Sequence, residues 1–264
     1  MNPTQTQLYR HILFEASDRI GTLTMNRPEK RNALSVDHMQ ELTDCFRAVG
    51  EDRDIAVVIL KANGPAFCAG HDLGELTGRA PEYYRHVFEV CTTLMDTIQS
   101  IPQPVIAQVQ GIATAAGCQL AATCDLAVAA ETARFATPGV KIGLFCSTPM
   151  VAVSRNLPRK KMMEMLLTGE PISAQAALQY GLINRVVPGD ALASETVALA
   201  RRIVISSPFV VALGKQASYR QLDLPQPQAY AYAQEVMSQN AMAADAQEGM
   251  CAFLEKRQPQ WVGR

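Results

Sequence analysis

This sequence of 264 residues lacks several features that would assign it to a functional class. Its seven cysteines form no C-x-x-C pair and no cluster with histidine, so we expect reduced thiols and no metal site. No run approaches the roughly 18 consecutive apolar residues that a membrane span needs. The formal net charge of -1 leaves no overall basic excess, which disfavours nucleic acid and anionic membranes as main partners.

The first 18 residues also lack the signals of a targeting segment. They contain no long apolar stretch, and they carry acidic side chains at Glu15 and Asp18. Neither property is typical of a secretory or transit peptide. From these absences we expect a soluble, cytoplasmic protein.

Hydrophobic residues make up 48% of the chain, which is enough for one large core. Leu8–Phe14 and Ile20–Met25 predict an opening hairpin, and Ser35 is a suitable N-cap for a helix that runs to about Gly50. Three later apolar runs predict buried strands, and a small-residue helix is expected between the last two. These segments are Ile55–Leu60, Val105–Val109, Ala115–Thr123 (the helix) and Leu126–Ala130. Such alternation predicts an α/β fold.

The pattern from Pro158 onward is almost entirely helical. We expect the last helix over about Ala229–Lys256, with apolar residues on one face that the core or another subunit must cover. The chain therefore divides into a core, residues 1–200, and a C-terminal helical region, residues 201–264.

Two turns rich in small residues, Ala66–Leu73 and Gly111–Cys118, follow buried strands. If Ala116 and Gly117 begin the helix, their N–H groups are unpaired at the positive end of its dipole and suit a developing negative oxygen. A second N–H, from Ala69, would complete an oxyanion hole. The alternative is that both turns are only tight, closely packed connections.

Four segments resemble, in order, the signature segments of the crotonase superfamily of enoyl-CoA hydratases and isomerases. They are NRPEKRNAL from Asn26, AFCAGHDL from Ala66, GIATAAGCQLAATCDLAVA from Gly111 and LTGEPISAQAALQYGLINRVV from Leu167. The similarity spans essentially the whole chain. It implies a ClpP/crotonase-like spiral of ββα units whose C-terminal helices form a homotrimer or a dimer of trimers.

The resemblance also implies a groove for an acyl-CoA thioester, with coenzyme A as part of the substrate and no further cofactor. By motif position, the oxyanion N–H groups map to Ala69 and Ala116. Lys30 or Arg31 would pair with the CoA phosphates, unless the two form only a solvated basic turn. The expected substrate-binding residues are Lys30, Arg31, Ala69, Gly70, His71, Asp72, Leu73 and Gly117.

Neither carboxylate of the family's hydratase mechanism is present. The first would follow Cys118, where the chain has Gln119, and an amide can orient water but cannot take its proton. The second would follow Pro138, where the chain has Gly139. The next turn, residues 144–149, is also altered. This combination is similar to a subgroup of the superfamily that is named for its fold more than for a demonstrated reaction.

Four other side chains are candidates for acid–base chemistry: His71, Glu75, His86 and Cys146. Each also has a structural interpretation, because a histidine in a turn commonly bonds to backbone or solvent and a lone cysteine commonly packs as a small hydrophobe. The sequence alone leaves both interpretations open.

We therefore expect an enzyme that stabilises an oxyanion during hydration, double-bond shift, decarboxylation or thioester hydrolysis, with efficient hydration disfavoured by the missing carboxylates. The alternatives are a non-catalytic acyl-CoA-binding protein and a purely structural trimer. Fatty-acid or acyl-CoA metabolism is the expected setting.

Overall fold

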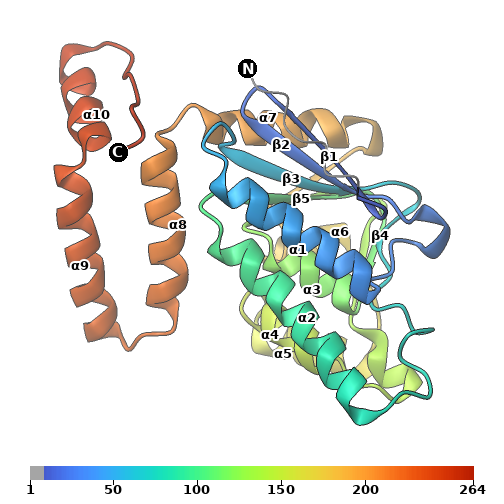
Figure 1. Cartoon of the computed structure of the whole chain (residues 1–264). Helices are drawn as coiled ribbons and strands as arrows, with labels where there is room; N and C mark the ends of the chain where they lie inside the picture. Colours follow the sequence, from blue (N-terminus) through green and yellow to red (C-terminus); the bar gives the residue numbers. More distant parts are fainter. Residues whose placement is uncertain (1–8) are drawn as a thin grey trace.

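A computed structural model of the chain describes residues 9–264, so Leu8 in the predicted first strand lies outside the described residues. The fold is a two-sheet α/β core with helices on both faces of the larger sheet (Figure 1). The α/β class expected from the sequence is confirmed.

The larger sheet has six strands in the order β1-β2-β3-β5-β7-β10. β1 and β2 form the predicted antiparallel hairpin, and the remaining neighbours pair in parallel. The strands predicted at 105–109 and 126–130 are confirmed, while β3 begins two residues later than expected. The bounds are β1 Ile12–Ser17, β2 Ile20–Met25, β3 Val57–Ala62, β5 Val105–Val109, β7 Leu126–Ala130 and β10 Arg185–Val187.

A second sheet, which the sequence did not predict, has the order β4-β6-β8-β9. Its strands are β4 Ala66–Cys68, β6 Ile112–Thr114, β8 Arg134–Ala136 and β9 Ile172–Ser173. Each of the first three follows a strand of the larger sheet after a short connection, and β4 and β6 then lead to a helix. The two turns rich in small residues therefore lie side by side at the ends of paired strands.

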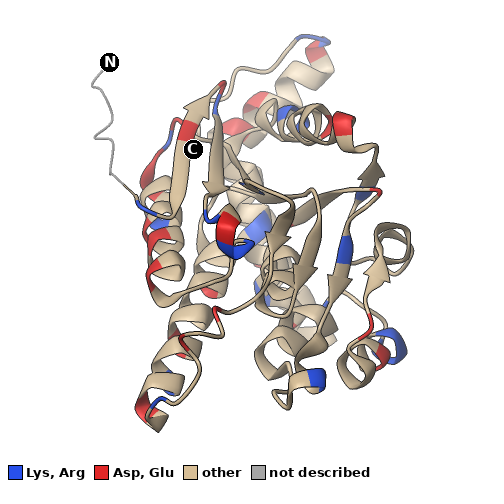
Figure 2. Ribbon diagram, turned by 90° about the vertical axis from the view of Figure 1, so that its right-hand side faces the viewer, with Lys and Arg blue, Asp and Glu red and all other residues tan. Residues whose placement is uncertain are grey.

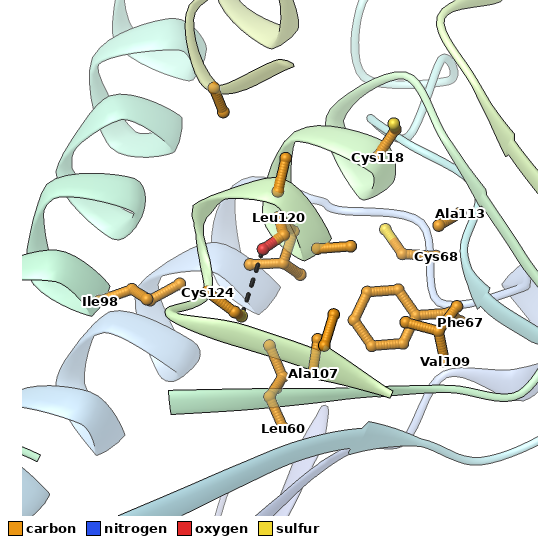
Figure 3. Packing of buried hydrophobic residues seen from close by; sticks show 14 of the residues in the cluster. Leu60, Phe67, Cys68, Ile98, Ala107, Val109, Ala113, Cys118, Leu120 and Cys124 are labelled. Carbon is orange, nitrogen blue, oxygen red and sulfur yellow. Dashed lines mark hydrogen bonds between the residues drawn. The ribbon is translucent and has the colours of Figure 1, made fainter. Parts of the chain in front are cut away.

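Helices α1 (Val36–Glu51), α2 (Pro81–Ser100) and α3 (Ala116–Thr123) pack on one face of the larger sheet, and α7 (Leu192–Val204) packs on the other (Figure 1). Ser35 caps α1 as predicted, since its hydroxyl accepts from the His38 N–H at 3.2 Å. Figure 3 shows the dense packing beside α3, where the Cys124 thiol donates to the Leu120 carbonyl. This packing holds the start of α3 in a fixed place.

The remaining core elements are short, and all but the first follow β8 in the chain. They are η1 Pro28–Lys30, η2 Pro138–Ile142, α4 Ser147–Ser154, α5 Arg159–Thr168, α6 Ala174–Gln179 and η3 Gly189–Ala191.

Helices α8 (Pro208–Leu222), α9 (Gln226–Met242) and α10 (Ala244–Glu255) extend from one side of the core (Figure 1). The prediction of one last helix over about 229–256 is wrong. The chain leaves the helical conformation at Ala243, whose ψ is 145°. The α9 helix has no buried residue.

A buried ion pair fastens α8 to the core. Lys215 Nζ lies 2.8 Å from Asp125 Oδ2 and also donates to the carbonyls of Ile98 and Gln103. The hydroxyl of Tyr219 donates to Asp125 Oδ1 at 2.8 Å. Because Lys215 and Tyr219 both belong to α8, this cluster fixes where the C-terminal helices leave the core.

Positions of Lys and Arg are interspersed with positions of Asp and Glu along the ribbon in Figure 2. Within residues 9–264 no single helix has the length and apolar character needed to cross a bilayer.

Candidate functional site

A cavity of about 400 Å³ opens where the turns after β4 and β6 face α2, η2 and the start of α4. Its wall is mostly apolar and has few ionisable side chains. It is formed by Ala69, His71, Leu73, Leu76, Phe88, Thr114, Ala115, Ala116, Pro138, Gly139, Lys141, Ile142, Leu144, Phe145, Cys146, Ser147, Thr148 and Pro149. Such a wall suits an apolar ligand group with polar contacts confined to a few positions.

The two small-residue turns touch at Gly70, whose φ of +91° favours glycine. A Cβ at this position would lie 2.9 Å from the Cβ of Ala115 and 3.0 Å from the Thr114 carbonyl oxygen. A Cβ at Gly117 would overlap the Cys68 carbonyl. Both glycines are therefore needed for the close approach of the turns, and neither lines the cavity.

The first helical residue of α3 is Ala116, one residue after the predicted start and in the position that the oxyanion hypothesis required. The Ala115 carbonyl accepts from the Gln119 N–H at 3.0 Å and so points into the helix. Because the intervening peptide is trans, the Ala116 N–H points the opposite way, out of the helix start. Ala116 lines the cavity, and its N–H has no acceptor among the described residues.

The structure contradicts Ala69 as the second donor. Its N–H already donates to the Arg31 carbonyl at 3.0 Å. The next peptide links Gly70 to His71, and its carbonyl, that of Gly70, accepts from the Leu34 N–H at 2.8 Å. Because this peptide is trans, the N–H of His71 points the opposite way, away from Leu34. Within residues 9–264 this His71 N–H has no acceptor. Because His71 also lines the cavity, its N–H is a candidate for the second donor.

Neither position of the missing carboxylates presents an acid–base side chain to the cavity. The buried Gln119 side chain does not line the cavity and lies with its Oε1 4.0 Å from the Cys91 thiol on α2. Gly139 does line it, but a Cβ there would overlap the Leu144 carbonyl and lie 2.9 Å from Cys146 Sγ. The backbone of the altered turn therefore leaves no room for a side chain at position 139.

Of the four acid–base candidates, the structure brings His71 and Cys146 to the cavity. His86 is exposed on α2, and Glu75 accepts from the Val36 N–H at 2.9 Å, which assigns it to the start of α1. Neither of these two side chains lines the cavity.

The two candidates at the cavity are both neutral in their surroundings. Burial lowers the pKa of His71 to about 4, and the nearby Leu34 backbone opposes this shift. Both ring nitrogens are buried and make no well-directed hydrogen bond with described residues, while Phe88 packs edge-on at 5.6 Å. Burial also raises the pKa of the Cys146 thiol, whose sulfur accepts from the Gly139 N–H at 3.3 Å.

The remaining predicted binding residues lie around the turn instead of in the cavity wall, apart from Leu73. Lys30 and Arg31 are exposed at the end of η1. Asp72 pairs with Arg27, a contact that the sequence did not predict. The wall residues on α2 and in the loop after η2 were also missed, because an apolar side chain in a variable segment carries no pattern that separates a cavity wall from ordinary core.

Comparison with known proteins gives the family. Residues 15–264 match the family described as enoyl-CoA hydratase/isomerase. The human mitochondrial protein named enoyl-CoA hydratase domain-containing protein 3 is 48% identical over 245 residues, which cover 92% of this chain and 81% of the human one. The subgroup expected from the sequence is confirmed by this similarity.

Solved structures agree with this relationship and confirm the crotonase-like fold expected from the sequence. An enoyl-CoA hydratase from Mycobacterium smegmatis has a TM-score of 0.93 and 50% identity, covering 96% of this chain and 99% of that one. The structure of the human domain-containing protein 3 has a TM-score of 0.93 and 47% identity, covering 96% of this chain and all of that one (100%).

The names of the vertebrate relatives contradict the cytoplasmic location expected from the sequence, since those proteins are named mitochondrial. The expectation failed because it relied on the absence of a targeting pattern in the first 18 residues, and the absence of a pattern does not establish a location.

Proposed function

Because this chain belongs to the enoyl-CoA hydratase/isomerase family, we propose that it binds an acyl-CoA thioester and stabilises negative charge on the thioester oxygen. The N–H groups of His71 and Ala116 are the proposed donors. Coenzyme A enters as part of the substrate, and the chemistry needs no further cofactor.

The observation that carries this proposal is the pair of unpaired amides beside one apolar cavity. Both residues line the cavity, and the turns that hold them meet where Gly70 approaches Thr114 and Ala115. The Ala116 donor also lies at the positive end of α3. Preorganised donors of this kind stabilise a developing oxyanion, and removal of one typically costs about 10²–10³ in kcat.

The rest of the substrate has matching surroundings. The apolar side chains Leu76, Phe88 and Phe145 suit a hydrocarbon acyl group. Lys30 and Arg31, exposed beside the Ala69 turn, are proposed to contact the CoA phosphates. We also propose that the exposed apolar residues of α10 are covered by further copies in a homotrimer or dimer of trimers.

Enzymatic oxyanion stabilisation does not require the two carboxylates, but rapid hydration does. General acid–base help is worth about 10²–10⁴-fold for a positioned group. We therefore propose isomerisation, decarboxylation or thioester hydrolysis, with hydration only as a slow reaction. The closed turn at Gly139 favours one alternative, a binding protein that has retained the donors and lost the chemistry.

The test uses the full chain with enoyl-, malonyl- and saturated acyl-CoAs, with products followed by mass spectrometry. A second measurement records the absorbance of a dienoyl-CoA, which moves to longer wavelength when its thioester oxygen accepts hydrogen bonds. An amide-to-ester replacement, with lactic acid in place of Ala116, removes one N–H and leaves the side chain unchanged. The same replacement at Ala244, the first residue of α10, is the matched control.

We expect the ester at position 116 to reduce the absorbance shift and any turnover by at least about tenfold, while the ester at 244 leaves both unchanged. Turnover of one substrate class identifies the reaction. Binding with a full shift and no product supports the binding-protein alternative. An unshifted spectrum for bound dienoyl-CoA contradicts the proposed oxyanion site.

A further inference from the structure

We propose that the partly buried ion pair between Arg27 and Asp72 positions the His71 N–H for the thioester oxygen, an inference that rests on the proposed function. Neither charged side chain lines the cavity, so the pair acts through the peptide between Gly70 and His71. Arg27 and Asp72 are therefore positioning residues.

Arg27 links two segments that are distant in sequence. Its Nη1 donates to the Ala33 carbonyl at 2.6 Å, while its Nη2 lies 3.2 Å from Asp72 Oδ2. The two side chains are only 12% and 20% exposed, so solvent screens the contact weakly. The planar guanidinium makes both contacts at once, which the single ammonium of a lysine reproduces poorly.

Backbone hydrogen bonds then extend this link to both sides of His71. The Leu34 N–H donates to the Gly70 carbonyl at 2.8 Å, and the Asp72 N–H donates to the Leu34 carbonyl at 3.0 Å. The Leu34 N–H thus holds the peptide that carries the His71 N–H. The Leu34 carbonyl holds the following peptide through the Asp72 N–H. A rotation of this peptide would turn the N–H away from the cavity.

The carboxylate of Asp72 also stabilises the turn that follows. Its Oδ1 accepts from the Gly74 N–H at 3.2 Å, while Oδ2 meets Arg27. Leu73, between these residues, lines the cavity. The Asp72 carboxylate therefore couples the donor peptide to the cavity rim. Without its bond to Arg27, the donor peptide and the rim would both be less well fixed. A displacement of about 1 Å in such a site can cost about 10²-fold in rate.

The experiment measures the absorbance shift of saturating dienoyl-CoA and, separately, its dissociation constant. The variants are Arg27→Leu, Asp72→Asn and Arg27→Lys. The exposed pair of Arg201 and Asp18 supplies a matched control, Arg201→Leu, which removes an ion pair remote from the turn. Thermal unfolding and circular dichroism identify the folded variants, and Asp72→Asn keeps the test available if Arg27→Leu does not fold.

We expect Arg27→Leu and Asp72→Asn to lose at least half of the shift at saturation, with a rise in Kd of less than about tenfold, because one hydrogen bond to a neutral donor contributes modestly to binding. Arg27→Lys recovers part of the shift, and Arg201→Leu keeps all of it. A purely structural role would lower the unfolding temperature without changing the shift of the folded complex.

The outcomes separate this inference from the one on which it rests. A full shift in the wild type, Arg27→Leu and Asp72→Asn overturns the positioning role alone. The absence of a shift in the bound wild-type complex overturns the oxyanion site and the positioning role together.

Discussion

At the scale of single residues, Ala115 has an unusual backbone conformation next to the proposed site. Its φ of 51° and ψ of -119° lie in a region that residues with a Cβ seldom occupy. The strain of such a conformation is about 1–3 kcal/mol, and it persists here because the Ala115 N–H donates to the Ala136 carbonyl and α3 begins directly afterwards.

We expect Ala115→Gly to raise the free energy of unfolding by about 1 kcal/mol, since relief of the strain exceeds the added flexibility of the unfolded chain. Urea denaturation measures the change. Ala122→Gly in the interior of the same helix is the control and should destabilise by about 1 kcal/mol or more. A loss of stability in Ala115→Gly would show that the conformation is not strained.

Two buried histidines predict how stability depends on pH. Burial lowers the pKa of both His38 and His71 to about 4 in the folded chain, from an ordinary value of 6.5. Between these values the unfolded chain binds more protons, so stability falls as the pH decreases from about 6.5 to 4, by roughly 3 kcal/mol for each histidine. Above pH 6.5 this contribution is fully present.

Urea denaturation at a series of pH values tests this expectation. In His38→Gln the loss of stability between pH 6.5 and 4 should be smaller by roughly 3 kcal/mol than in the wild type. His86→Gln, which removes an exposed histidine from α2, is the control. Equal slopes in the wild type and His38→Gln would contradict the assignment of a neutral buried imidazole.

The sequence identified the turns of the site but misplaced one donor within them. Ala116 could be predicted because an N–H at the start of a helix is unpaired whatever surrounds it. The choice between Ala69 and His71 depends on which carbonyls of the segment 31–34 they face, and this contact joins residues almost 40 positions apart. No local pattern encodes it.

At the scale of elements, long apolar strands and capped helices were predictable, while the short strands of the second sheet were not. The three residues of β4 or β6 are too few to show an alternating pattern. The break between α9 and α10 was missed because Ala243, whose backbone is extended there, is neither glycine nor proline.

The cluster around Lys215 gives a prediction about α8. Lys215→Met leaves Asp125 with its charge buried beside Tyr219 and without its cation, so we expect a loss of about 3–5 kcal/mol in the free energy of unfolding. Urea denaturation measures it, with Lys160→Met on the surface of α5 as the control. A loss below about 1 kcal/mol would mean that the pair contributes little to the docking of α8.

At the scale of the whole molecule, the C-terminal helices leave large apolar side chains uncovered. Phe253 is 82% exposed and Leu254 80% exposed at the end of α10. A monomer rarely exposes adjacent side chains of this size. The apolar face of the predicted last helix indicated that the core or another subunit must cover it, and the resemblance to a known family supplied the expectation of a trimer.

We expect the double variant Phe253→Asp with Leu254→Asp to shift the protein toward monomer, because charged side chains would be buried in the interface. Sedimentation velocity measures the change. The control is Leu13→Asp, an exposed apolar position on β1. An unchanged sedimentation coefficient would place the subunit interface elsewhere.

The crowding at Gly139 constrains how this protein could evolve. Any side chain at that position would bring its Cβ into overlap with the Leu144 carbonyl and to 2.9 Å from the Cys146 sulfur. A substitution at position 139 alone could therefore not place a second carboxylate in the cavity. A route to two-carboxylate chemistry would have to open the turn after η2 as well as replace the glycine, so the two changes are coupled.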